Sequence, residues 1–433
     1  MPDTGANVAV IAGQTFAVED VLFVSDEALA AVCINRSVHL LDAATMFPKK
    51  ILPGYNDGLR QLLLLREGLA VATAYDGGLL ELGRGDGRWT CRDKLPVMAD
   101  SSRSSWCWSV EKIDAGLYAA GGMNEIVLAD LTRDRVLCRI TATGKNKIEH
   151  LLYLPNLDST LIASSVEGAR LYRVAEKNGE MFLEERGALA MPDTPSCYWI
   201  VRCGDRLYAS VNVKVNKERT PRIMGYSLTE PLAGQEPEII ETGAPFGRIR
   251  DIRALGPWLM ASGLCGGDGG KECSYVGFYN LRDGTWSDLK LQGFRGYIIH
   301  SAAWQEAPDT WRVAVAEKYS NGRLRRYRLD ASGGELKAEE LGEPVVFPAS
   351  PCDVAFDGAG DLLVTALDGG LYALPWTEEE YRRLFRNKCY LQTFGADMSA
   401  LYSPVDPSGR LGTVLADFGN RLEKTARAGR RGR

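Results

Sequence analysis

The strongest constraint in this sequence is a strand pattern that recurs eight times, at intervals of about 40 to 50 residues. Each unit begins with a short apolar strand and later contains a strand of alternating apolar and polar residues that follows a turn. The clearest internal match is between residues 71–82 (VATAYDGGLLEL) and residues 363–374 (LVTALDGGLYAL). In both, an Asp-Gly turn separates two alternating strands, which indicates a β-hairpin. The pattern predicts strands and turns over most of residues 7–376.

A period of this length with four strands per unit is typical of a β-propeller, whose small sheets bury their faces against one another. The first strands are expected within a few residues of Val21, Leu59, Cys107, Ile148, Cys197, Ile249, Ile298 and Cys352. Only the eighth unit lacks a fourth strand, and segment 7–12 is the natural candidate to supply it and so remove an exposed edge. We therefore expect an all-β propeller of eight four-stranded blades closed by this N-terminal strand. Seven blades is the alternative if residues 296–350 divide differently.

The chain changes character after Trp376. Residues 377–388 begin with a Thr and three Glu, an N-cap with an acidic first turn, and are predicted to form a helix. We expect a propeller over residues 1–376, a C-terminal extension over 377–420 and a basic, disordered tail over 421–433. The tail has six Lys or Arg against one Glu, on a chain of net charge −5. Its candidates for contacts with a nucleic acid or an acidic partner are Arg427, Arg430, Arg431 and Arg433.

This pattern resembles the WD-repeat and YVTN-like β-propellers over residues 1–376. The sequence contains no Gly-His and no Trp-Asp dipeptide, the two dipeptides that mark WD repeats, so the resemblance is one of architecture. It implies a rigid platform that binds other macromolecules. A minority of such propellers are enzymes with a metal or cofactor at the central channel.

Residues at the start of the innermost strands are expected to reach one rim of the disc and the central channel. Aromatic and Arg side chains are favoured at the centres of protein interfaces. On this basis, with one acidic neighbour, the predicted partner-binding residues are Trp106, Tyr198, Arg250, Asp251 and Tyr297. The titratable residues predicted to be possible channel ligands are Glu149, His150, His300 and Asp353.

Known catalytic patterns are missing from the sequence. There is no Gly-x-Ser-x-Gly motif, and the Gly-rich segment 266–270 is not followed by the Lys-Ser/Thr pair of a phosphate loop. The chain has only three His, so a metal site built from several His is not expected. We predict no catalytic residues, no metal and no cofactor.

Cysteine usage and the lack of targeting segments indicate the compartment. The ten Cys are spread singly, several between apolar residues, as is typical of reduced thiols in the cytosol. The N-terminus lacks a basic segment followed by a long apolar one, and no apolar run approaches the roughly 18 residues of a membrane span. We expect a cytoplasmic protein that does not contact membranes.

Together these features favour a non-enzymatic protein-interaction platform or regulatory subunit of a cytosolic multi-protein system. Its partner would be another protein, bound through the propeller rim and the C-terminal extension. The abundance of Ala, Gly and Arg indicates a bacterial source. Two alternatives stay open: an enzyme or small-ligand sensor, resembling propeller lactonases or hydrolases, with its site in the channel, and a nucleic-acid-associated subunit that uses the basic tail.

Overall fold

A computed structural model places the chain in two compact units. One comprises Met1–Leu59, Ile299–Asp330 and Ala338–Arg433, and the other comprises Arg60–Ile298 and Ala331–Lys337. We call them the first and second unit. The residues that the structure describes are 7–10, 18–25, 28–33, 37–42, 48–53, 59–66, 69–74, 79–85, 88–94, 109–114, 116–123, 125–130, 132–133, 135–141, 147–191, 195–215, 218–242, 246–265, 273–295, 297–318, 322–342, 344–346, 350–356, 360, 362–366, 370–374 and 392–393.

The second unit contains five four-stranded antiparallel sheets, each with its strands in sequence order; Leu59, the first residue of the first of these sheets, belongs to the first unit. The first two are β6 (Leu59–Arg66), β7 (Leu69–Ala74), β8 (Leu79–Gly85) and β9 (Arg88–Lys94), then β10 (Ser109–Lys112), β11 (Leu117–Gly121), β12 (Glu125–Asp130) and β13 (Arg135–Thr141). The third is β14 (Ile148–Leu154), β15 (Thr160–Ser165), β16 (Gly168–Lys177) and β17 (Glu180–Ala188). The fourth and fifth are β18 (Pro195–Cys203), β19 (Arg206–Val215), β20 (Glu218–Ser227) and β21 (Glu238–Glu241), then β22 (Phe246–Leu255), β23 (Trp258–Cys265), β24 (Cys273–Asn280) and β25 (Thr285–Arg295).

The first unit contains three further sheets, of which two are five-stranded. One is β2 (Val18–Ser25), β3 (Ala28–Cys33), β4 (Ser37–Asp42) and β5 (Pro48–Pro53). The next is β26 (Tyr297–Ala307), β27 (Thr310–Lys318), β28 (Arg323–Asp330) and β29 (Lys337–Glu340), with β30 (Val345–Val346) paired to β28; β26 and β29 begin with residues of the second unit. The last runs in the order β31 (Pro351–Phe356), β32 (Leu362–Ala366), β33 (Gly370–Leu374), β1 (Asn7–Val10) and β34 (Gln392–Thr393).

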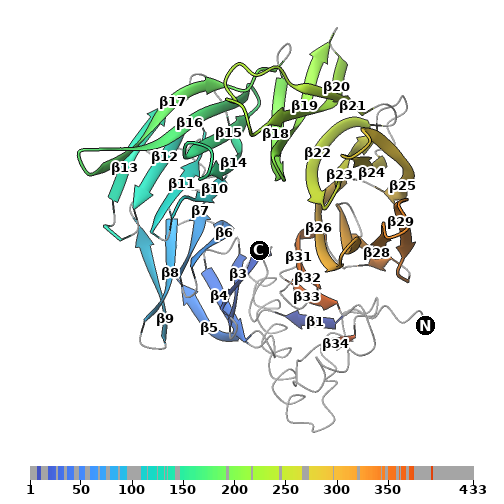
Figure 1. Cartoon of the computed structure of the whole chain (residues 1–433). Coiled ribbons are helices and arrows are strands. Elements are labelled where there is room, and N and C mark those ends of the chain that lie inside the picture. Colours follow the sequence, from blue (N-terminus) through green and yellow to red (C-terminus); the bar gives the residue numbers. More distant parts are fainter. Residues whose placement is uncertain are drawn as a thin grey trace. The chain divides into compact units, whose positions relative to one another are not determined.

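Both ends of the described chain meet in this last sheet (Figure 1). Strand β1 pairs antiparallel with β33, with Asn7 opposite Ala373 and Val10 opposite Gly370. The sequence predicted no fourth strand for the eighth repeat. In the structure, β1 from segment 7–12 occupies that position. In every sheet, the observed first strand also lies within a few residues of its predicted start.

Short turns with positive φ angles join consecutive strands. Between β16 and β17 the turn consists of Asn178 and Gly179, whose φ angles are 56° and 78°. Two consecutive positive φ angles define the type I′ turn that matches the twist of a β-hairpin, and Asn-Gly is its preferred sequence. Local turn chemistry therefore fixes the register of these strands.

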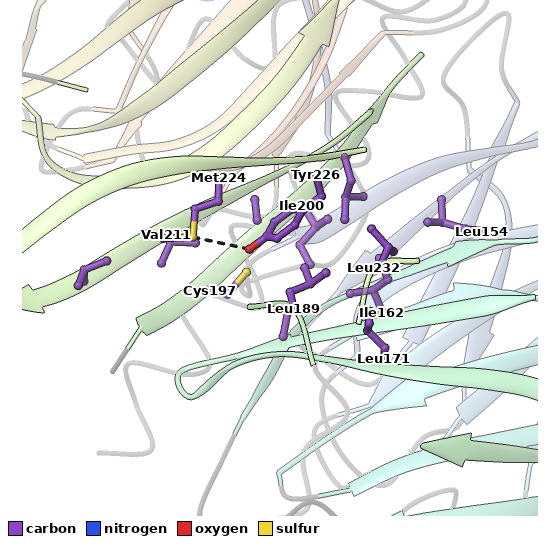
Figure 2. Packing of buried hydrophobic residues seen from close by; sticks show 14 residues of the cluster. Leu154, Ile162, Leu171, Leu189, Cys197, Ile200, Val211, Met224, Tyr226 and Leu232 are labelled. Carbon is purple, nitrogen blue, oxygen red and sulfur yellow. Dashed lines mark hydrogen bonds between the residues drawn. The ribbon is translucent and has the colours of Figure 1, made fainter. Parts of the chain in front are cut away.

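The cores of the second unit lie between successive sheets. Figure 2 shows one of them, where Leu154, Ile162 and Leu171 from the third sheet pack with Met224 and Tyr226 from the fourth. The hydroxyl of Tyr226 donates a hydrogen bond to the carbonyl of Ala190 at 2.7 Å, which satisfies its polar atom inside the core. The second, third and fourth sheets therefore have a hydrophobic core on both faces, which explains why β12 of the second sheet is buried over four consecutive residues.

Several predictions lie outside the described residues: the helix near 377–388, the basic tail with its arginines, and Trp106. Among the described residues, no helix is long and apolar enough to cross a membrane.

Candidate interaction site

The first strands of three successive sheets carry a β-bulge at the same place. The register shifts occur between Ile148 and His150 in β14, between Cys197 and Trp199 in β18, and between Ile249 and Asp251 in β22. The extra residue at each bulge is therefore Glu149, Tyr198 or Arg250. Bulges bend a strand and re-aim its side chains, and they are common beside functional sites. In the first unit, β31 has a similar shift between Pro351 and Asp353.

The bulges change which side chains are open to solvent. In a regular strand, successive side chains point to opposite faces. In β18, however, Cys197 and Ile200 are buried while the two residues between them, Tyr198 and Trp199, are both partly exposed. Strand β14 repeats this pattern. We call the two residues at each of these three bulges the bulge surface: Glu149, His150, Tyr198, Trp199, Arg250 and Asp251.

Serines on the second strands support two of the bulges. Ser210 accepts a hydrogen bond from the Trp199 N–H at 3.1 Å and donates one to the Trp199 carbonyl at 3.3 Å. Ser164 donates to the His150 carbonyl at 3.2 Å. The serine at the matching position of the third bulge is Ser262, which lies opposite Asp251 in the register. These hydrogen bonds satisfy backbone groups that the bulges remove from the regular ladder.

A glycine makes room for the third bulge. Gly263 lies opposite Ile249, and a Cβ atom placed on it would overlap the backbone carbonyl oxygen of Arg248. Only glycine lets the two strands approach this closely. In addition, Asn212 on β19 donates a hydrogen bond from Nδ2 to the Ile249 carbonyl at 3.2 Å, which links the fourth sheet to the bulge of the fifth.

His150 and Trp199 stack on each other across two sheets, with ring centroids 4.3 Å apart and an angle of 29° between the rings. Burial lowers the pKa of His150 to about 4; the carboxylate of Asp251 opposes this shift and Arg253 adds to it. The imidazole is therefore neutral at pH 7. Its Nδ1 atom is buried and has no hydrogen-bond partner in the part of the chain that the structure describes.

Charged side chains surround the bulge surface. The guanidinium of Arg248 lies over the ring of Tyr198, 4.4 Å from its centroid. Asp251, expected at the rim, is only 7% exposed and pairs with Arg253 at 3.1 Å. Arg250, by contrast, is exposed. The bulge surface therefore combines aromatic rings with the exposed Arg250, the partly exposed carboxylate of Glu149 and the buried carboxylate of Asp251.

Two further sets of contacts hold β14: an ion pair of its residue Glu149 and hydrogen bonds to side chains of β10. Lys147 pairs with Glu149 at 2.8 Å. The Ser109 hydroxyl of β10 accepts a hydrogen bond from the Leu151 N–H at 3.1 Å, and Glu111 accepts one from the Tyr153 N–H at 3.0 Å. Burial raises the pKa of Glu111 to about 7, and the hydrogen bond from Tyr153 opposes that shift. These bonds fix β14 against β10.

The predicted channel residues divide between the two units. Glu149 and His150 belong to the second unit, whereas His300 and Asp353 belong to the first. The structure brings His300 and Asp353 together, with 3.5 Å between Nδ1 and Oδ1. Tyr297 is the first residue of β26. Within the described residues, no group of three or more His, Cys, Asp and Glu side chains is placed to hold a metal ion.

Some residues of the site were not selected from the sequence. Trp199, Arg248 and Arg253 lie beside the selected Tyr198 and Arg250. The signal that predicts Trp199 is the spacing of three between the apolar Cys197 and Ile200 inside a strand, because regular alternation would place these two residues on opposite faces; no such spacing encloses Arg248 or Arg253.

Comparisons with known proteins place the fold. The structure is similar to the computationally designed Ika8 protein, with a TM-score of 0.60 and 12% identity over 85% of this chain and 99% of Ika8. It is also similar to Saccharomyces cerevisiae Sqt1, with a TM-score of 0.62 and 10% identity over 85% of this chain and 98% of Sqt1. A weaker likeness, with a TM-score of 0.48 and 14% identity over 76% of this chain and 96% of the other, is to the WD40 beta propeller domain of Doa1.

No family model and no curated protein matches the sequence. At 10 and 12% identity, the structural likenesses define the fold alone. Together with the repeated four-stranded antiparallel sheets, they show an all-β, propeller-like fold, in agreement with the architecture inferred from the sequence.

Proposed function

We propose that this chain is a non-enzymatic protein-interaction platform, or the regulatory subunit of a multi-protein system, and that it binds its partner through the bulge surface. The observation that supports this most directly is the exposure of Tyr198 and Arg250 as the extra residues of two neighbouring bulges. Tyr and Arg are enriched among the residues that dominate binding energy at interfaces. Ser210 and Gly263 hold the backbone beneath these bulges, so little order has to be gained on binding.

We also propose that the sheets form a complete propeller. Eight antiparallel sheets are present among the described residues, and β1 pairs with β33 in the sheet that also contains β31 and β32. We infer eight blades closed by the N-terminal strand. We further infer a cytoplasmic, bacterial protein whose segment 377–420 adds to the partner contact.

Affinity capture from the native host tests this function. The baits are the wild-type chain, Tyr198→Ala, a chain that ends at Trp376, and Phe182→Ala as a matched control, since Phe182 is a partly exposed aromatic residue on β17. We expect a stoichiometric protein partner on the wild type and on Phe182→Ala, and at least about tenfold less of it on Tyr198→Ala. A partner retained equally by all full-length baits would contradict the use of the bulge surface.

The two other functions considered from the sequence give different results in the same experiment. A small molecule or metal that co-purifies without any protein would move the function to a ligand site. Nucleic acid that is captured by the wild type and lost both by the chain that ends at Trp376 and by an added bait that lacks only residues 421–433 would move it to the basic tail. Either result would overturn the proposed function.

A further inference from the structure

Strands β23 and β24 bring two cysteines to the same level of the fifth sheet. The register of these strands pairs Leu264 with Ser274. Continued by one residue, it places Cys265, the last residue of β23, opposite Cys273, the first residue of β24. In the sequence the two cysteines are separated by residues 266–272 only. One end of a single hairpin therefore carries a cross-strand pair of cysteines.

The neighbouring strands hold this pair from both sides. Phe246 of β22 lies opposite Cys265, and Arg295 of β25 lies opposite Cys273. The two cysteines thus belong to the inner strands of a four-stranded sheet within the second unit. Pairing with a strand on each side fixes the backbone positions of both residues.

Directly opposite residues on antiparallel strands are close enough for a disulfide. Their Cα atoms are about 5.5 Å apart in a hydrogen-bonded pair and about 4.5 Å apart in a non-hydrogen-bonded pair. A disulfide spans Cα separations of about 4.4 to 6.8 Å, so both kinds of pair fall within its range. The Cβ atoms of such pairs are about 4.5 to 5.5 Å apart, slightly farther than the mean of about 3.8 Å in a disulfide. A bond that has to draw two strands together is easier to reduce again.

Other cysteines of the second unit lie in different surroundings. Cys138, which is free, lies opposite Leu128, and Cys203, also free, lies opposite Arg206. Burial raises the pKa of the Cys197 thiol and that of the Cys203 thiol, which lowers the fraction of reactive thiolate at pH 7. The register therefore singles out Cys265 and Cys273 as a pair that can react with each other.

We infer that Cys265 and Cys273 form a reversible disulfide when the protein is exposed to hydrogen peroxide. The thiolate of one cysteine attacks a peroxide oxygen and the O–O bond breaks, which yields a sulfenic acid and one water. The second thiolate then attacks the sulfenic sulfur, so that the S–S bond forms, the S–O bond breaks and a second water leaves. The two thiols lose two electrons and two protons, and the peroxide is reduced to water. A dithiol restores both thiols by exchange. This inference is independent of the proposed partner binding.

Peptide mapping without reductant tests this inference. The full chain is reduced, freed of reductant and treated with hydrogen peroxide, and the remaining thiols are alkylated. The monomer is isolated on a non-reducing gel and digested with trypsin. Trypsin cleaves after Lys271, between the two cysteines, so only a disulfide keeps peptides 254–271 and 272–282 joined. Mass spectrometry counts the joined peptides before and after treatment with a dithiol.

Two variants accompany the wild type. Cys265→Ser removes one thiol of the pair. Cys138→Ser is the matched control, because Cys138 is a partly exposed cysteine on a strand whose opposite residue, Leu128, is not a cysteine.

The expected result is about tenfold or more joined peptide after peroxide than before it, in the wild type and in Cys138→Ser alike, and its loss after the dithiol. Cys265→Ser should give none. Recovery of both cysteines as alkylated thiols, or as sulfinic acids without joined peptide, would overturn the inference. Joined peptides found only in a disulfide-linked dimer, or either cysteine joined to a different one, would overturn it as well.

Discussion

Two histidines occupy the same position in sheets of different units, yet their environments differ. His150 follows the buried Ile148 by two residues in the first strand of its sheet, and His300 follows the buried Ile298 by two residues in the first strand of its own. His150 stacks on Trp199 and its pKa is lowered to about 4. His300 instead lies 3.5 Å from Asp353, and its side chain is 40% exposed.

The difference comes from the next sheet along the chain. Trp199 and Asp353 hold equivalent places, each just after the bulge in the first strand of the sheet that follows. The repeated backbone therefore pairs side chains of consecutive sheets at a fixed position, and the identity of the second residue decides the chemistry. An aromatic partner gives a partly exposed ring stack and a neutral imidazole, whereas a carboxylate gives a partly exposed polar pair.

The largest effect is expected for Trp199→Ala. It removes the indole from the stack, and because Trp199 is partly exposed we expect a loss of about 2 kcal/mol in the free energy of unfolding, below the range for a fully buried Trp. The pKa of His150 should rise toward its ordinary value of 6.5, since burial causes the shift. Denaturant unfolding measures the change in the free energy of unfolding, and an NMR titration measures the pKa of His150. An unchanged pKa would show that Trp199 does not create the environment of His150.

The loss of stability at acid pH should be larger for the wild type than for His150→Phe, whose aromatic ring cannot bind a proton. The folded pKa of His150, about 4, lies below the unfolded value, so the unfolded chain binds the proton first and stability falls as the pH drops from 6.5 to 4. His150→Phe keeps a ring against Trp199 but removes this term. We expect the wild type to lose about 2 kcal/mol relative to His150→Phe across that range.

The contribution of Glu111 cancels in this comparison because both proteins contain it. Burial raises its pKa to about 7, so its effect has the opposite sign, and stability falls as the pH rises from 4.5 to 7. Parallel pH profiles for the wild type and His150→Phe, measured by denaturant unfolding, would contradict the assignment to His150.

A serine pair tests the backbone that positions these rings. Ser210→Ala removes both hydrogen bonds to Trp199, and we expect a loss of about 1 to 2 kcal/mol. Ser262→Ala is the matched control, because within the described part of the chain the Ser262 hydroxyl makes no hydrogen bond. Its loss should stay below about 0.5 kcal/mol. Thermal unfolding measures both, and equal losses would refute the role of Ser210 at the bulge.

The smallest effect is expected for Asp353→Asn. The pair with His300 is solvent-exposed, and such pairs contribute about 0 to 1 kcal/mol. We expect a loss of about 0.5 kcal/mol or less, further reduced by salt. A loss as large as that of Trp199→Ala, measured by the same denaturant unfolding, would erase the distinction between the two histidines.

The strands were predictable from the sequence because alternation and turn residues are local signals. The start near Ile148 and the N-terminal strand that joins the last sheet are two examples. Tyr198 and Arg250, which were selected from the sequence, both stand at bulges, and their role in binding stays a prediction.

The bulges were not predicted, because a bulge is defined by its partner strand. Tyr198 is an extra residue only because Trp199 pairs with Ser210 and Cys197 pairs with Val211. The burial of Asp251 and the contact between His150 and Trp199 follow from the same register and from packing between sheets. No pattern along the chain encodes these contacts directly.

The most direct test of the central claim is site-specific photocrosslinking in the native host. A benzophenone amino acid replaces Tyr198 in one protein and Arg282 in another, which keeps an aromatic ring at the bulge surface and places the same probe at an exposed turn. The account predicts that position 198 crosslinks to the partner captured by the wild type and that position 282 does not. Crosslinking to that partner from position 282 alone would contradict it.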